Sequence, residues 1–180
     1  MKSALALVTF ALLGNPAFAQ THAHGATHAQ SPYADMTNRE IKALSNEQIT
    51  DLRAGRGMSL ALPAELNGYP GPSHALELAQ QLDLSSAQRA QIQALFGEMK
   101  REATALGARI IDSERALDTL FAARTVTPEK LNVATADAAA LQGQLRAAHL
   151  KYHLHMRDLL TATQVARYNE LRGYQKMNRP

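Results

Sequence analysis

Apolar residues recur every three or four positions along two long stretches of the chain. In the first stretch, residues 88–124, they are Ile92, Leu95, Met99, Leu106, Ile110, Leu117 and Leu120. In the second, residues 128–159, they are Leu131, Ala134, Ala138, Leu141, Leu145, Ala148, Tyr152 and Leu159. This spacing puts one apolar stripe along each of two helices. Between them, Thr127 supplies an N-cap and Pro128 a first helical residue, so the second helix is expected to return antiparallel to the first.

Shorter helices are predicted on both sides of this hairpin. Residues 74–82 are apolar at helical spacing behind Ser73, which is expected to cap them, and a last short helix is expected after Thr161. Upstream, residues 32–72 predict a helical arm that ends in a break at Asn67–Pro72, because proline fixes φ and glycine permits turns. No segment alternates with period two for long enough to form a strand. The predicted fold is all-α: a long antiparallel helical hairpin closed by shorter helices at each end, with an N-terminal helical arm.

Two pentads mark the starts of helices in the same way. Each has a capping hydroxyl followed three positions later by glutamine, which is the pattern of a capping box. They are Leu84-Ser85-Ser86-Ala87-Gln88 and Leu160-Thr161-Ala162-Thr163-Gln164, 76 positions apart.

The paired pentads resemble the LTxxQ motif, which appears twice in the Spy/CpxP family of periplasmic proteins; Ser85 stands where that family more often has threonine. The resemblance covers residues 74–174 and implies a four-helix core. It also implies one of three functions, since the family includes ATP-independent chaperones, envelope-stress regulators and heavy-metal-resistance sensors.

The first 19 residues have the pattern of an export signal. Lys2 precedes the apolar run Ala4–Leu13, and Ala17-Phe18-Ala19 is a cleavage site of the A-x-A type. At about 10 residues, the apolar run is too short to span a bilayer. We therefore expect cleavage after Ala19, a periplasmic location and no membrane span. The expected organisation is 1–19 signal peptide, 20–31 histidine-containing segment, 32–72 arm and Pro/Gly linker, 73–175 LTxxQ-type helical domain and 176–180 tail.

Charge and motif content exclude several function classes. Without Lys2 the chain has 18 Lys and Arg against 16 Asp and Glu, and no basic cluster of the kind that binds nucleic acid. It has no cysteine nucleophile, no G-x-S-x-G and no H-E-x-x-H motif. We therefore expect neither an enzyme nor a nucleic-acid-binding protein.

One group of residues has the chemistry of a transition-metal site. His149, His153 and Met156 form a row on one face of the second long helix, and the antiparallel return is expected to bring His74 and Glu77 near them. Imidazole, carboxylate and thioether donors suit Zn, Ni, Co or Cu. The alternative from the residues alone is that His149 and Met156 pack in the apolar stripe, or that the histidines sense pH.

The resemblance bears on the same residues. In the nickel- and cobalt-resistance sensors of this family, metal is held by histidines of the first core helix and by a histidine and a methionine four positions apart before the second motif. Met156 matches that methionine, whereas Tyr152 stands where the histidine is expected and His149 and His153 are its neighbours. A possible secondary metal-binding segment contains His22, His24 and His28, although such a tract is also typical of a solvated N-terminus.

The last prediction concerns an apolar surface. Leu150 and Leu154 lie opposite the apolar stripe and are expected to be exposed, beside Arg146, Lys151 and Arg157. Such a surface suits the binding of unfolded or misfolded envelope proteins, and equally a homodimer interface. A membrane-bound stress sensor is the alternative partner that the resemblance implies.

Overall fold

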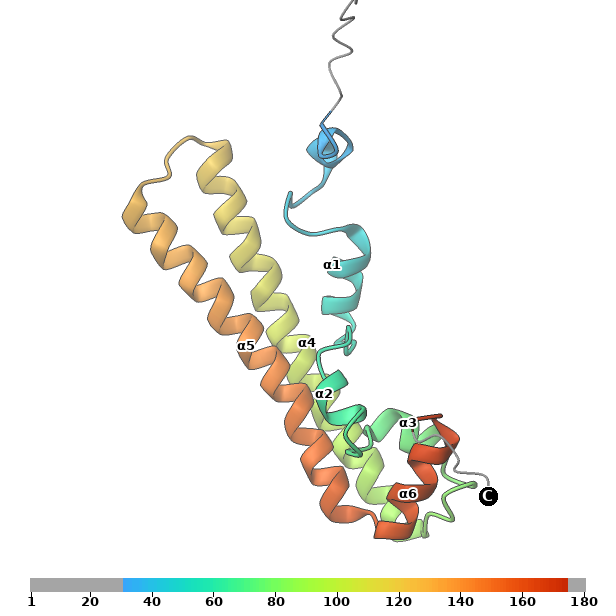
Figure 1. Ribbon diagram of the computed structural model, residues 1–180. Helices are drawn as coiled ribbons and strands as arrows, with labels where there is room; N and C mark the ends of the chain where they lie inside the picture. The colour runs from blue at the N-terminus through green and yellow to red at the C-terminus, as the bar shows by residue number, and fades with distance from the viewer. Residues whose placement is uncertain (1–30, 175–180) are drawn as a thin grey trace, which may run out of the picture. The chain divides into compact units, whose positions relative to one another are not determined.

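The computed structural model describes residues 31–174, and these residues contain helices but no strand. A 3-10 helix, η1, spans Ala34–Asn38. The α-helices are α1 Asn46–Arg53, α2 Leu62–Glu65, α3 Pro72–Glu77, α4 Ser86–Ala122, α5 Pro128–Leu159 and α6 Ala162–Leu171 (Figure 1). The chain divides after Ala34 into two compact units, and all six α-helices belong to the second. No helix in the described residues is both long and apolar enough to cross a membrane.

The predicted hairpin is confirmed in α4 and α5, which run antiparallel beside one another (Figure 1). Thr127 caps α5 by accepting a hydrogen bond from the backbone N–H of Lys130 at 3.3 Å, and Pro128 is its first residue. The two helices are also joined by Glu102 of α4, which pairs with Lys151 at 2.6 Å and accepts a hydrogen bond from the Tyr152 hydroxyl at 3.1 Å. The fold class expected from the sequence is therefore correct.

Both pentads form capping boxes, and the structure joins the two boxes to each other. The side-chain amides of Gln88 and Gln164 pair reciprocally, with N–H···O distances of 2.8 and 3.1 Å. Gln88 also donates to the carbonyl of Leu159 at 3.3 Å, and Gln164 donates to the carbonyl of Leu82 at 3.2 Å. The start of α4 is thereby bound to the start of α6, so the repeated glutamine closes this end of the helical unit.

The expected cap of α3 is wrong. The N-cap is Gly71 rather than Ser73, Pro72 is the first helical residue, and the helix ends at Glu77 instead of continuing to Leu82. Proline favours the first helical position because its fixed φ suits a helix and its missing N–H costs no hydrogen bond there. After α3 the chain turns through Asp83, whose φ is +49°, and this turn brings Ser85 to the start of α4.

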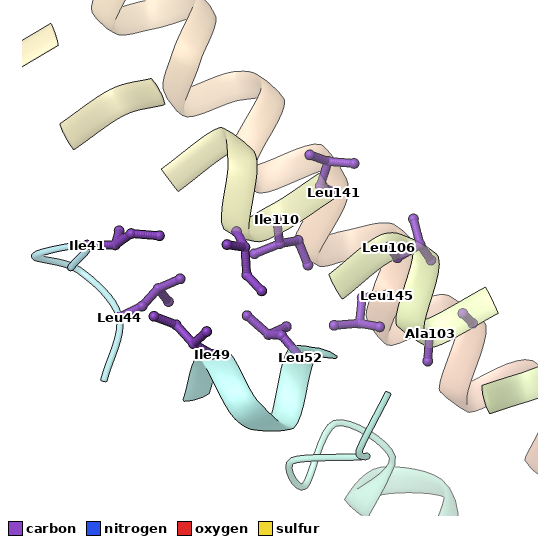
Figure 2. Packing of buried hydrophobic residues seen from close by; sticks show 11 residues of the cluster. Ile41, Leu44, Ile49, Leu52, Ala103, Leu106, Ile110, Leu141 and Leu145 are labelled. Atoms are coloured by element: carbon purple, nitrogen blue, oxygen red, sulfur yellow. The ribbon is translucent and has the colours of Figure 1, made fainter. Parts of the chain in front are cut away.

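The buried core has two hydrophobic clusters, which lie at different levels along the α4–α5 hairpin. The first joins the arm to the middle of α4 and α5: Figure 2 shows Ile49 and Leu52 of α1 pointing toward Ile110 of α4 and Leu145 of α5. The second joins α3 and α6 to the start of α4 and the end of α5. Its members are Ala75, Ala79, Leu82, Leu84, Ile92, Met156, Leu160, Val165 and Tyr168.

The apolar stripes are only half-buried toward the α4–α5 turn. Leu117 and Leu120 of α4 and Leu131 of α5 are partly exposed there, whereas Leu106, Ile110, Leu141 and Leu145 are buried. The two helices diverge toward this turn (Figure 1), and a cavity of about 780 Å³ lies between them. The arm's apolar contacts reach Ile110 and Ile111 of α4, and beyond them its contacts with α4 are the polar pairs Glu40–Arg115 and Lys42–Asp118.

Candidate functional site

A buried carboxylate, Glu65, is the centre of a polar cluster within the second unit. Glu65 is the last residue of the short helix α2 and is 6% exposed. Its Oε1 accepts hydrogen bonds from the hydroxyls of Tyr168 and Tyr174, the latter at 3.0 Å. The same oxygen lies 3.4 Å from Nδ1 of His74, while Oε2 lies 3.6 Å from Nδ1 of His153. Segments far apart in the sequence therefore meet at one side chain.

The orientation of the His153 ring is fixed by a backbone partner. Its Nδ1 lies 2.7 Å from the carbonyl oxygen of Tyr69. A carbonyl can only accept, so Nδ1 carries a proton, and Nε2 is the nitrogen on which a neutral imidazole would have its free lone pair. Gly71 makes room for this ring, because a Cβ there would lie 3.0 Å from Cε1 of His153. Histidine ligands of metals are commonly oriented by such a bond from the second ring nitrogen.

His149, one turn earlier on α5, has an unpartnered nitrogen. The residue is 3% exposed, and its Nε2 is buried without a hydrogen-bond partner. Burial, reinforced by the neighbouring charge of His153, lowers the pKa of His149. A hydrogen bond to the backbone of Arg56 and the charge of Glu102 oppose that shift in the pKa. The ring is therefore neutral at pH 7, and a buried imidazole nitrogen without a partner is an unfavourable arrangement that a ligand would relieve.

These side chains line one cavity of about 590 Å³ between the arm, α3, α4, α5 and the residues Arg172 and Tyr174. The cavity wall includes four groups that can donate electron pairs to a cation: Glu65, His74, His149 and His153. Two thioether side chains and three cationic side chains also line it, namely Met58, Met99, Arg56, Lys100 and Arg172. As they stand, no three or more His, Cys, Asp or Glu side chains in residues 31–174 converge closely enough to hold a metal ion. The cavity is therefore lined by side chains that can ligate a metal, but they are not positioned to coordinate one ion in this conformation.

The structure brings together only some of the residues predicted from the sequence. His74 and His153 share Glu65, and His149 lines the same cavity. Glu77 is exposed and accepts a hydrogen bond from the Ser73 hydroxyl at 3.3 Å, so it lies outside this cluster. Met156 is 0% exposed and packs in the second apolar cluster instead of lining the cavity. The row on α5 thus divides: its two histidines lie against the cavity, and its methionine packs in the apolar core.

Tyr152, at the position where the resemblance would place a histidine, is engaged elsewhere. Its hydroxyl donates to Glu102, and its ring meets that of His155 edge-on, with centroids 5.8 Å apart. Leu154 is exposed as expected, at 54%, whereas Leu150 is half-buried. His22, His24 and His28 lie outside the described residues.

Sequence reasoning missed the centre of the cluster. Glu65 falls within the predicted arm and Tyr168 within the last predicted helix, and neither was singled out from the sequence. Burial, together with the bond to Glu65, raises the pKa of Tyr168, so its phenol remains a hydrogen-bond donor. The local signal for Glu65 is an acid among the apolar residues Leu62, Ala64 and Leu66, and that signal is weak.

Comparison with known proteins identifies a family whose model matches this chain. The family model described as heavy-metal resistance matches residues 58–167, which include Glu65, His74, His149 and His153. No curated protein and no solved structure matches the chain. The match covers more than half of the chain, and the all-helical fold with its long hairpin agrees with it. The chain belongs to the heavy-metal resistance family, which lies within the Spy/CpxP-like superfamily of helical proteins.

Proposed function

We propose that this protein binds a divalent transition-metal ion in the periplasm, through Glu65, His74 and His153, as a sensor or buffer in heavy-metal resistance. The observation that supports this most directly is the position of Glu65: its two carboxylate oxygens lie 3.4 Å from Nδ1 of His74 and 3.6 Å from Nδ1 of His153, so one carboxylate lies beside two imidazole rings from different helices. One carboxylate with two imidazoles is a donor set for borderline ions such as Zn²⁺, Ni²⁺, Co²⁺ or Cu²⁺.

The donor types present suit such an ion. The Nδ1–H of His153 is held by a backbone carbonyl, which leaves Nε2 available, and the unpartnered Nε2 of His149 supplies a further candidate donor in the same cavity wall. The side chain of His74 is 39% exposed, so its ring can turn to bring a nitrogen toward the ion. In this proposal Glu65 takes the place expected for Glu77, and the buried Met156 is not a ligand.

The test is calorimetric titration of the mature protein with Zn²⁺. His22, His24 and His28 are changed to alanine in every sample, because histidine-rich tracts can also bind such ions. We expect one ion per chain, with binding weakened about tenfold or more by Glu65→Gln or His153→Ala, since even the outer partners of metal ligands contribute that much. Affinity should also fall as the pH drops below about 6.5, because a protonated imidazole cannot bind the ion.

The matched control is His155→Ala. His155 is an exposed histidine on the same helix, two positions from His153, and it does not line the cavity. Its loss should leave Zn²⁺ affinity unchanged. Binding that survives both Glu65→Gln and His153→Ala, or that is absent once the N-terminal histidines are replaced, would refute the core site.

A second candidate function is that of an ATP-independent chaperone for unfolded envelope proteins. The observation that favours it is the cavity between the diverging halves of α4 and α5, with the exposed Val133 in its wall and the exposed Leu154 further along α5. Homodimer formation through the same surface remains a prediction. A chaperone should suppress aggregation of a reduced client protein at stoichiometric ratio. Val133→Ser with Leu154→Ser should weaken that suppression, whereas Leu66→Ser, at an equally exposed leucine of the arm, should not.

A further inference from the structure

Two residues that follow α6 bind the same carboxylate as the candidate metal site. We name Arg172 and Tyr174 the C-terminal clamp. The Tyr174 hydroxyl donates to Oε1 of Glu65 at 3.0 Å, and Nε of Arg172 donates to that hydroxyl at 3.2 Å. Nε of Arg172 also lies 3.7 Å from Oε1, and its guanidinium lies over the Tyr174 ring, 5.6 Å from the centroid. The end of the described chain is thereby attached to α2.

Oxygen Oε1 of Glu65 has no capacity for an additional partner. A carboxylate oxygen offers about two lone-pair positions, and Oε1 already accepts from the hydroxyls of Tyr168 and Tyr174. His74 approaches the same oxygen at 3.4 Å. A cation bound through Oε1, the oxygen beside His74, must therefore take the position of one of the two phenols. Binding through Oε2, which His153 approaches at 3.6 Å, would leave both phenols in place.

Of these two phenols, that of Tyr174 is the easier to displace. Tyr168 is fully buried in the second apolar cluster, and its hydroxyl also accepts from the backbone N–H of Gly71 at 3.4 Å. Tyr174 is only half-buried and lies beyond the last turn of α6. The positive charge of Arg172 lies beside Oε1 and would be repelled by a metal cation bound there. Metal binding at Oε1 would therefore displace the Tyr174 hydroxyl and repel the Arg172 guanidinium together.

We propose that the C-terminal clamp and the metal ion compete for Glu65, so that Arg172 and Tyr174 set the metal affinity of the site and are released when the ion binds. This inference rests on the proposed metal-binding function. The family match ends at residue 167, so both clamp residues lie outside it. Because coupling between two binding equilibria is reciprocal, removing the clamp must strengthen metal binding by the factor by which metal weakens the clamp.

The test compares Zn²⁺ affinity of the mature protein with that of two Tyr→Phe variants, in the background without the N-terminal histidines. Tyr174→Phe removes the competing hydroxyl and keeps the ring, and it should tighten Zn²⁺ binding about tenfold, the size expected for a hydrogen bond to a charged group. Tyr152→Phe is the matched control, because it removes an equivalent phenol–carboxylate bond at Glu102 instead of Glu65. Its Zn²⁺ affinity should equal that of the unmodified protein.

A second measurement does not depend on any variant. Trypsin cleaves after arginine, and release of the clamp should speed cleavage after Arg172 when Zn²⁺ is added. Cleavage after the exposed Arg124, in the α4–α5 turn, reports any direct effect of Zn²⁺ on trypsin.

The outcomes separate the two proposals. Zn²⁺ binding that does not require Glu65 overturns the proposed function and this inference together. Zn²⁺ binding that requires Glu65, with Tyr174→Phe no tighter than Tyr152→Phe and with unchanged cleavage after Arg172, overturns only the competition. Tighter binding in Tyr174→Phe together with faster cleavage after Arg172 supports it.

Discussion

Replacing Gly107 with alanine should destabilise the protein, although Gly107 lies within a helix where alanine is intrinsically favoured. Gly107 is a buried residue of α4 at the crossing with α1. A Cβ added there would lie 2.2 Å from the carbonyl oxygen of Leu52, 2.7 Å from its carbonyl carbon and 3.1 Å from its Cα. These are backbone atoms of α1, so relief requires moving that helix rather than turning a side chain.

Two opposing free energies decide the result. Glycine to alanine inside a helix favours folding by about 1 kcal/mol. Overpacking a filled core costs typically ~1–3 kcal/mol, and occasionally more, and a displaced α1 also loses part of the burial of Ile49 and Leu52, each worth about 1.5–3 kcal/mol when complete. The clash is with rigid backbone at 2.2 Å, so we expect the cost to exceed the gain and the free energy of unfolding to fall by about 1–3 kcal/mol.

Gly143→Ala is the matched control. Gly143 is an exposed residue of α5, and a Cβ there meets no atom within 4 Å. Only the intrinsic helix preference remains, so this variant should be stabilised by roughly 0.5–1 kcal/mol.

The assay is thermal unfolding followed by circular dichroism at 222 nm. For a protein of this size, 1 kcal/mol corresponds to a change in Tm of about 2–4 °C. Gly107→Ala should therefore melt several degrees lower than the unmodified protein, and Gly143→Ala a few degrees higher. If Gly107→Ala melted higher, as Gly143→Ala should, α1 would not approach α4 closely enough to need a glycine, and the packing of the arm described above would be wrong.

The remaining predictions concern the glutamine pair and the buried histidine. Gln88→Ala and Gln164→Ala should each lower the free energy of unfolding in urea by about 1–2 kcal/mol. The double variant should lower it by less than the sum of the two, because both substitutions remove the same amide pair, and strictly additive effects would argue against that pair. Gln48→Ala, which removes the equivalent capping bond of α1, measures the contribution of capping alone. Burial lowers the pKa of His149 in the folded protein relative to the unfolded protein. At a pH between the folded and unfolded pKa of this residue, the unfolded chain therefore binds more protons than the folded one. As a result, Tm of the metal-free protein should fall as the pH drops below about 6.5. His149→Gln should flatten that dependence, whereas a slope unchanged by the substitution would assign it to other groups.

Much of the secondary structure could be predicted because it depends on neighbours in the sequence. The hydroxyl and glutamine of each pentad are three positions apart and satisfy each other's backbone partners, so both boxes are determined locally. The turn at Thr127 and Pro128 is equally local, and it determines the antiparallel hairpin. The cap of α3 was mispredicted where two local rules competed, and the preference of Pro72 for the first helical position prevailed over the capping tendency of Ser73.

The candidate site could not be predicted in the same way, because its contacts join distant residues. Glu65 meets Tyr168 and Tyr174, which are 103 and 109 positions away, and no periodicity relates such residues. The apolar spacing placed His149, His153 and Met156 on one helical face, yet that face is wide enough to border both a polar cavity and an apolar cluster. The sequence by itself therefore determined the helices, their caps and the hairpin. Only the tertiary structure decided which donors meet, since that depends on where the arm packs against α5 and on the contacts of Arg172 and Tyr174 with Glu65.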